Sequence, residues 1–255
     1  MKEFLMRKRI NVALMIIIII ISCAATYFVT DALTSGAEKG SVQTTEALYE
    51  SAVMDAIRIE EDEIYPLVCI DGTDELVRWN EAADKVLLVS WHRYPDSYIA
   101  GESLVLEWGE VWTFTDLEIK QWYQNTAADE GVEDWTLRLK QLIGLPSEKE
   151  YTHFTGFWVA PDDILRPAYS TDISVSVMTD QFDEEYDEAY KEWFDGNIVY
   201  SYFERQYPWT RLGYTYDWAE SSDDYGLTEF IISDGSSVEI EFTYSTEEFL
   251  DFLAQ

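Results

Sequence analysis

Basic residues are scarce in this sequence, and their scarcity limits what the protein can bind. Seventeen lysines and arginines stand against fifty aspartates and glutamates in 255 residues, which gives a formal net charge of −33. Four of the basic residues fall within the first nine positions, and no basic stripe follows them. Nucleic-acid-binding surfaces usually carry such a stripe, so the charge argues against DNA and RNA as partners. A basic protein or another envelope component would be attracted instead.

Cysteine and histidine are almost absent, which limits disulfide and zinc chemistry. Cys23 lies in an apolar segment and Cys69 in the remainder, so the folded part cannot form a disulfide within itself. Two histidines, His92 and His153, are too few for the usual zinc sites. Acidic runs at 71–75 and 180–187 could supply oxygen ligands to Ca²⁺, but neither has EF-hand spacing. We expect no cofactor, with Ca²⁺ as the weak alternative.

Motifs of known catalytic machinery are also missing. The sequence has no Gly-x-Ser-x-Gly elbow, phosphate-binding loop, dinucleotide fingerprint or His-Glu-x-x-His pair. A hydrolase that needs only two carboxylates stays open, because so acidic a chain meets that requirement trivially. The sequence therefore favours a non-catalytic binding module of the bacterial envelope. A carboxylate-dependent hydrolase of glycans or peptides, acting outside the cytoplasm, is the alternative.

One long apolar run stands near the N-terminus. Residues 10–29 carry no charge and include six consecutive isoleucines, enough for a helix to cross a bilayer core of about 30 Å. The basic tail at 1–9 should stay in the cytoplasm, which predicts a single-pass membrane protein with residues 46–255 outside. The run is interpreted as a signal anchor or a signal peptide, and Cys23 as a candidate lipidation site. Residues 30–45 lack apolar periodicity and are interpreted as a linker.

Apolar periodicity in residues 46–255 predicts helices and strands in irregular alternation. Two hairpins are expected, one from 104–106 with 111–114 and one from 228–233 with 237–244, the latter around Asp234-Gly235. Thr115 with Glu118, and Ser245 with Glu248, are predicted capping boxes. The expected fold is α+β, with a mainly antiparallel sheet and several packed helices, preceded by one N-terminal transmembrane helix. The other expected elements are strands 86–91 and 153–159 and helices 48–57, 115–122, 135–142, 182–193 and 245–253.

Six side chains are candidates for a polar pocket. His92 follows the buried strand 86–91, a position at which sheets that contain helices often carry active-site residues. The segment 209–218 has few aliphatic residues and places four of the candidates close together. Two structural alternatives stay open: a strand-end histidine held by a neighbour, and arginines that brace the fold by pairing with carboxylates. The candidates are His92, Arg166, Arg211, Tyr214, Tyr216 and Asp217.

Several stretches resemble a family of uncharacterised bacterial exported proteins and lipoproteins. They are residues 138–146 (RLKQLIGLP), 157–167 (FWVAPDDILRP), 208–218 (PWTRLGYTYDW) and 226–230 (GLTEF). The resemblance extends over most of 86–244 and implies an exported bacterial domain. That family has no assigned activity, so the resemblance implies no catalytic residue.

Overall fold

The computed structural model describes residues 44–129 and 131–255. In this part of the chain no helix combines the length and the hydrophobicity needed to cross a membrane. The predicted membrane segment at 10–29, with Cys23, lies outside the described residues. The helices are α2 (Thr45–Asp55), α3 (Asp116–Asp129), α4 (Trp135–Leu142), α5 (Glu188–Val199) and α6 (Thr246–Leu253). The strands are β1 (Val86–His92), β2 (Ser103–Val105), β3 (Val111–Thr115), β4 (His153–Val159), β5 (Ile164–Leu165), β6 (Tyr214–Asp217), β7 (Asp224–Thr228), β8 (Phe230–Ile232) and β9 (Ser237–Ser245).

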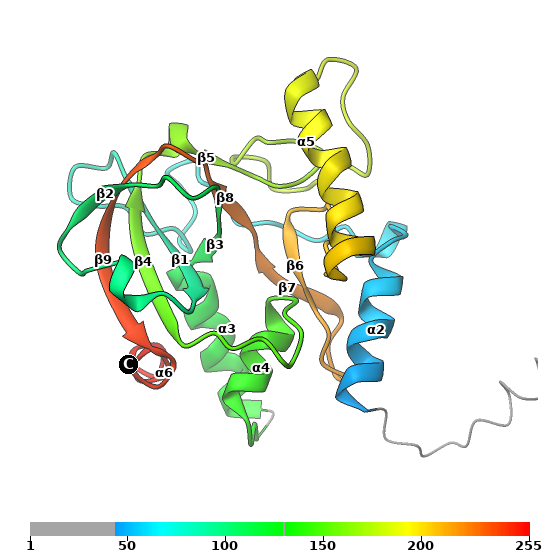
Figure 1. Cartoon of the computed structure of the whole chain (residues 1–255), viewed down its shortest axis with the longest axis horizontal. Helices are drawn as coiled ribbons and strands as arrows, with labels where there is room; N and C mark the ends of the chain where they lie inside the picture. Colours follow the sequence, from blue (N-terminus) through cyan, green and yellow to red (C-terminus); the bar gives the residue numbers. More distant parts are fainter. Residues whose placement is uncertain (1–43, 130) are drawn as a thin grey trace, which may run out of the picture. The chain divides into compact units, whose positions relative to one another are not determined.

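The fold is α+β with a mainly antiparallel sheet, which confirms that part of the prediction (Figure 1). Seven strands form one sheet in the order β2-β9-β4-β1-β3-β8-β5, and β6 pairs with β7 separately. Its central strand β1 is buried along almost its whole length, as the continuous apolar run predicts.

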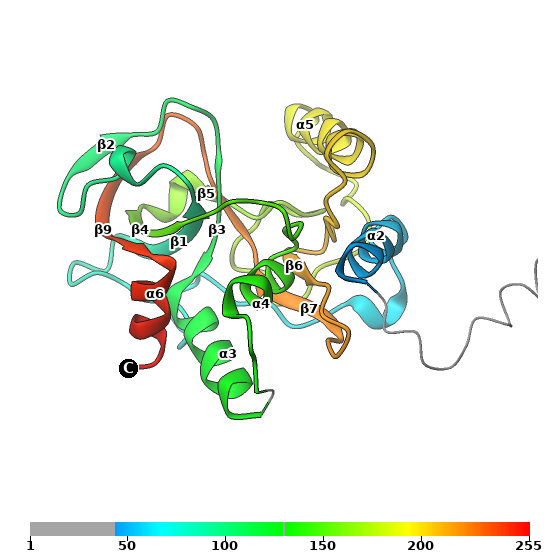
Figure 2. The same cartoon turned by 60° about the horizontal axis from the view of Figure 1, so that its bottom comes forward.

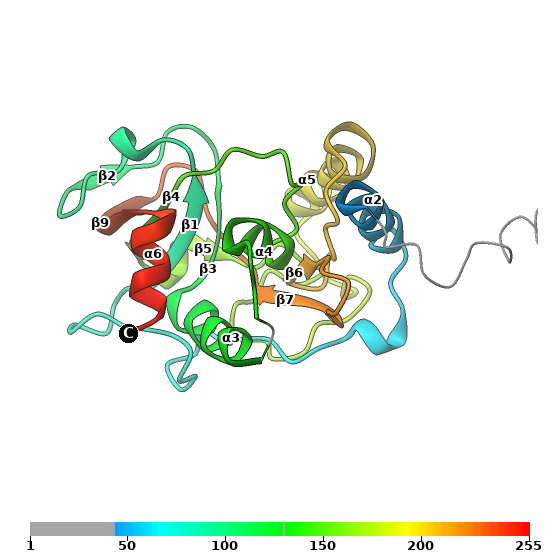
Figure 3. The ribbon, with the colours of Figure 1, turned by 90° about the horizontal axis from the view of Figure 1, so that it is seen from below.

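Apolar side chains pack on both faces of the sheet, because successive side chains of a strand point to opposite faces. Val89 lies in a core with residues of α3, α4 and α6, and Figure 3 shows α3 and α6 against the sheet from that side. Leu88 lies in another core that includes both Ile232 of β8 and Val238 of β9. Three strands separate β8 from β9 in the sheet order, yet the two share this core. The sheet is therefore strongly curved.

This curvature explains why both predicted hairpins are wrong. Gly235, at φ 83°, turns the chain as expected, but β8 pairs with β3 and β5 whereas β9 pairs with β2 and β4. Likewise β2 pairs with β9, and β3 pairs with β1 and β8. A turn sequence specifies a local reversal of the chain. The pairing partners follow from burial of the apolar face across the whole sheet.

The helix predicted at 182–193 starts later in the structure. The helix expected from residue 182 begins at Glu188, because the Asp187 side chain caps it by accepting from the Tyr190 N–H at 2.9 Å. Phe182 precedes the helix but still packs against Tyr190, with ring centroids 6.2 Å apart. The helix α5 and the turn Tyr200–Arg205 after it share a core with α2, on the side of β6 and β7 (Figure 2).

The two predicted capping boxes have different outcomes. Ser245 and Glu248 form the reciprocal pair that opens α6, which confirms the prediction. Thr115 accepts from the Glu118 N–H at 3.3 Å, but the Glu118 carboxylate turns inward to Thr228 instead of reaching back to the cap. The predicted hydrogen bond from the Thr115 N–H to the Glu118 carboxylate is therefore wrong, because the buried Thr228 competes for that carboxylate.

Candidate functional site

A separation between β1 and β3 opens into a cavity. β1 pairs with β4 at all seven of its residues, but with β3 only at Leu88 and Val89. Beyond Val89 the two strands are no longer paired, and their ends line a cavity of about 1120 Å³. Other walls include α5, β6 and the segments 94–98, 106–110, 143–145 and 207–209. A cavity of this size can enclose a small organic ligand.

Three indole rings from separate elements form one side of the cavity, and we call them the tryptophan cluster. Trp112 comes from β3, Trp193 from α5, and Trp209 from the segment before β6. Their ring centroids lie 6.1–6.3 Å apart. The indole N–H of Trp209 donates to the carbonyl of Pro167 at 3.2 Å, which fixes the orientation of that ring. The cluster gives the cavity a rigid aromatic wall.

Glu229 places a carboxylate in the same cavity. It lies where the chain passes from β7 to β8, and its backbone N–H donates to the Gly213 carbonyl at 2.9 Å. Trp112 pairs with Ile231, so the two-residue alternation places Glu229 on the face that carries Trp112. Within the described residues no hydrogen bond reaches the Glu229 carboxylate, and burial raises its pKa to about 8.

Positive charge is missing from the cavity wall. Residues 44–255 contain twelve basic and 47 acidic side chains. None of the basic ones lines the cavity, whereas Glu110 and Glu229 both do. Among the described lining residues, no basic side chain balances these two glutamates, and a ligand would meet no lysine or arginine there.

His92 also lines the cavity, but its imidazole is held by neighbours. Its Nδ1 accepts from the Tyr94 N–H at 3.0 Å, so the proton is on Nε2, which donates to Thr155 Oγ1 at 2.7 Å. Thr155 in turn lies 2.9 Å from Thr243 Oγ1. Burial lowers the pKa of His92 to about 4, which keeps the ring neutral. No carboxylate in the described chain contacts the ring, so His92 lacks the partner that a general base needs.

Tyr214 and Tyr216 contribute to the lining, yet their hydroxyl groups are engaged elsewhere. The Tyr214 hydroxyl donates to the Glu63 carbonyl at 2.8 Å, and that of Tyr216 donates to the Asp55 carboxylate at 2.8 Å. Burial raises the pKa of both phenols above its usual range. The two tyrosines therefore line the cavity, and their hydroxyl groups hold β6 to the N-terminal part of the domain.

The other three candidates do not line the cavity. Asp217 is buried and accepts both guanidinium N–H groups of Arg138, at 2.9 and 2.8 Å. A bracing arginine–carboxylate pair of the expected kind thus exists, but at Arg138. In the described chain, Arg166 and Arg211 pair with no carboxylate and donate to backbone carbonyls, so the expectation is wrong for them. Those carbonyls belong to Val68, Asp172, Ile173 and Val175 for Arg166, and to Ala56 and Ile57 for Arg211.

Glu229 and Asn197 are among the polar residues of the cavity that sequence reasoning missed. Glu229 interrupts an apolar strand segment, and a lone glutamate among buried neighbours is a signal that could have identified it. Asn197 of α5 lines the cavity, and its Nδ2 is buried without a hydrogen-bond partner in the described part of the chain. Nothing in the sequence around Asn197 distinguishes it from a surface residue.

No family model matches the chain, and no curated protein or solved structure matches it either. The resemblance to exported bacterial proteins thus stays a prediction. Across the residues that the structure describes, no group of three or more His, Cys, Asp or Glu side chains could hold a metal ion. The function has to be argued from the cavity itself.

Proposed function

We propose that residues 45–255 form a non-catalytic binding domain that receives its ligand in the cavity between β1 and β3. The observation that supports this is the Glu229 carboxylate, which faces the cavity without a hydrogen-bond partner in the described residues. The buried Nδ2 of Asn197, which also belongs to the lining, likewise has no partner in the described residues, and leaving a buried polar group unpaired costs about 1–3 kcal/mol. A ligand would supply the missing partner, and the tryptophan cluster would supply contact area.

Gly196 allows the cavity to be blocked without disturbing its polar groups. It lines the cavity, and no atom lies within 4 Å of a Cβ built on it. Gly196→Phe in the full chain, in detergent, should fill the space and abolish the thermal stabilisation caused by a bound probe. The probes are choline and its uncharged analogue 3,3-dimethylbutan-1-ol. If neither raises the melting temperature of the unaltered protein, the proposal is wrong.

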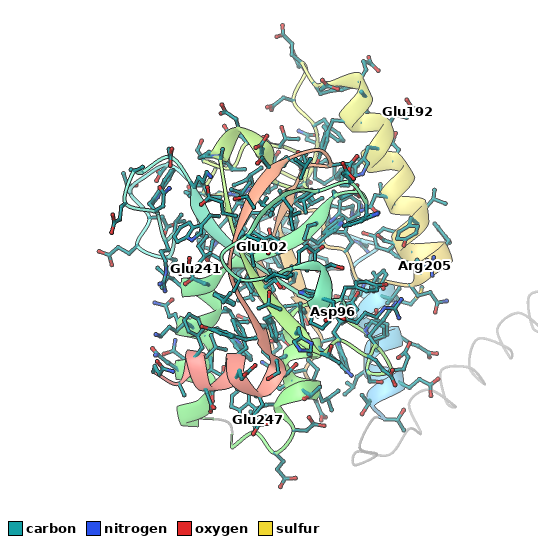
Figure 4. All side chains as sticks on the ribbon, turned by 60° about the vertical axis from the view of Figure 1, so that its left-hand side comes forward. Asp96, Glu102, Glu192, Arg205, Glu241 and Glu247 are labelled. Carbon is teal, nitrogen blue, oxygen red and sulfur yellow. The ribbon has the colours of Figure 1, made fainter. Side chains whose placement is uncertain are left out.

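We also propose that residues 10–29 tether this domain to the outer face of a bacterial membrane, where a basic protein or other envelope component meets its acidic surface. Figure 4 shows exposed carboxylates on separate elements, including Glu192 of α5, Glu241 of β9 and Glu247 of α6. A reporter enzyme that is active only outside the cytoplasm should work when fused after Gln255. Activity confined to a cytoplasmic reporter would contradict the placement. Cys23→Ser would separate lipidation from anchoring by the helix alone.

A hydrolase is the second candidate, and one observation favours it. A glutamate that keeps its proton near neutral pH can act as a general acid, and Glu229 has that property. It ranks second because glycoside hydrolysis needs a second carboxylate within about 10 Å of the first. The other glutamate of the lining, Glu110, belongs to the loop that carries Trp108, a residue that is 80% exposed. Turnover of 4-nitrophenyl glycosides by the full chain, lost in Glu229→Gln, would establish it. Absence of turnover leaves the binding proposal.

A further inference from the structure

A positive charge would favour the ionised form of Glu229, and the described residues that line the cavity supply none. Alone, this carboxyl group holds its proton near neutral pH, because burial raises its pKa to about 8. A cation beside it would favour the ionised form. No lysine or arginine of the described chain lines the cavity. His92 stays neutral, and its Nε2–H donates a hydrogen bond to Thr155. The charge that would stabilise the carboxylate has to arrive with the ligand.

The tryptophan cluster limits which kinds of cation the cavity can bind. Ammonium groups, including quaternary ones, are attracted to the faces of tryptophan rings, and the tryptophan cluster lines the same cavity as Glu229. A bare metal ion would need several ligands, and the described chain has no group of three or more His, Cys, Asp or Glu side chains that could hold one. An anion would meet two glutamates and no basic side chain. The lining therefore suits a cation with an organic body.

We infer that the cavity binds an organic cation whose ammonium group pairs with the Glu229 carboxylate and packs against the tryptophan cluster. This inference rests on the proposed binding function and deepens it by naming the chemical class of the ligand. Asn197 also requires something of the ligand. It belongs to the cavity lining, and its Nδ2 is buried with no acceptor for its N–H groups among the described residues. A hydroxyl or carbonyl oxygen on the ligand would accept a hydrogen bond from them. The net negative charge of the whole domain would draw such a cation towards it.

The ammonium group could belong to a free small amine or to a lysine side chain of a basic partner. Both present the same chemistry to Glu229, and an experiment can separate them. Calorimetric titration of the full chain in detergent would use three probes: choline, its uncharged analogue 3,3-dimethylbutan-1-ol, and tetralysine. Choline keeps its charge at every pH, so any pH dependence of its binding comes from the protein.

Choline affinity should rise by about 30-fold between pH 6.5 and pH 9, since only the ionised fraction of Glu229 binds the cation and that fraction follows a pKa of about 8. Binding of the uncharged analogue should change little over this range. Glu229→Gln should remove the pH dependence and reduce choline affinity to that of the analogue. Glu192→Gln, which removes an exposed carboxylate from α5, is the matched control and should behave like the unaltered protein.

Each result decides a separate point. If the analogue binds as well as choline at both pH values, the cation inference is overturned while the binding function stands. If none of the three probes binds, both are overturned. If tetralysine binds, and its binding depends on Glu229 and is lost in Gly196→Phe, the cation belongs to a lysine of a basic partner. If choline binds and tetralysine does not, the cation belongs to a free amine. Tetralysine binding that survives Glu229→Gln occurs on the acidic surface and counts against lysine as the ligand.

Discussion

Two glutamates with raised pKa values, Glu118 and Glu229, differ in what surrounds their carboxylates, since Glu118 is buried and Glu229 is half-buried in the cavity lining. Glu118 accepts from the backbone N–H and the hydroxyl of Thr228, each at 3.0 Å, and from the Tyr225 hydroxyl at 3.1 Å. Glu229 is the next residue after Thr228 and accepts none of these. Burial raises the pKa of both, to about 7 for Glu118 and about 8 for Glu229, although the Thr228 hydrogen bonds oppose the shift at Glu118. Hydrogen bonding and access to the cavity separate a structural carboxylate from one available to a ligand.

The comparison predicts that the most tightly partnered carboxylate has the largest effect on stability. Asp217→Ala would remove the carboxylate that accepts two N–H groups of the buried Arg138 guanidinium, at a cost of about 3–5 kcal/mol in the free energy of unfolding. Urea denaturation of the two proteins would measure the loss. A loss below about 1 kcal/mol would show that this pair does not brace the fold.

Glu118→Ala should destabilise the domain by about 2–4 kcal/mol. It removes a buried side chain and leaves the donors of Thr228 and Tyr225 unpaired. The same denaturation assay applies, with Glu229→Gln as the control because that change removes no protein hydrogen bond. Equal losses in the two variants would remove the distinction between these glutamates.

Glu229→Gln should change how stability depends on pH. An unfolded glutamate ionises near pH 4.3, so between about pH 4.3 and 8 the folded domain holds a proton that the unfolded chain has lost. The contribution of Glu229 is therefore fully present below pH 4.3 and is lost as the pH rises to 8. Relative to the unaltered protein, the variant should gain roughly 1–3 kcal/mol between pH 5 and pH 8. Glu118 acts in the same direction in both proteins and cancels. A constant difference across this range would show that Glu229 is not buried as described.

Thr155→Val should have the smallest effect. The change keeps the shape of the side chain but removes the acceptor for His92 Nε2, at a cost of about 1 kcal/mol. Choline binding should be unchanged, because the histidine holds the wall and does not contact the cation. A loss of binding with unchanged stability would place His92 among the groups that recognise the ligand.

The sequence predicts the elements better than their partners. The apolar run of β1, the strand β4 and the helix α4, which ends before Gly144 at φ 67°, follow from local patterns and agree with the structure. The hairpins fail because pairing in a curved sheet depends on which strands share a core. Three site candidates, His92, Tyr214 and Tyr216, line the cavity, since they follow or form strands that meet there. The missing hydrogen bond at Glu229 is a property of its surroundings in space, and no local pattern encodes it.

The cavity exists because β1 and β3 share main-chain pairing at only two positions. The separation of the two strands is therefore set by the course of their backbones, whereas the lining side chains set how much of the space between them stays open. Lining residues can be exchanged without changing that separation, as long as those two paired positions persist. An architecture of this kind can accept a new ligand through substitutions that leave the fold intact.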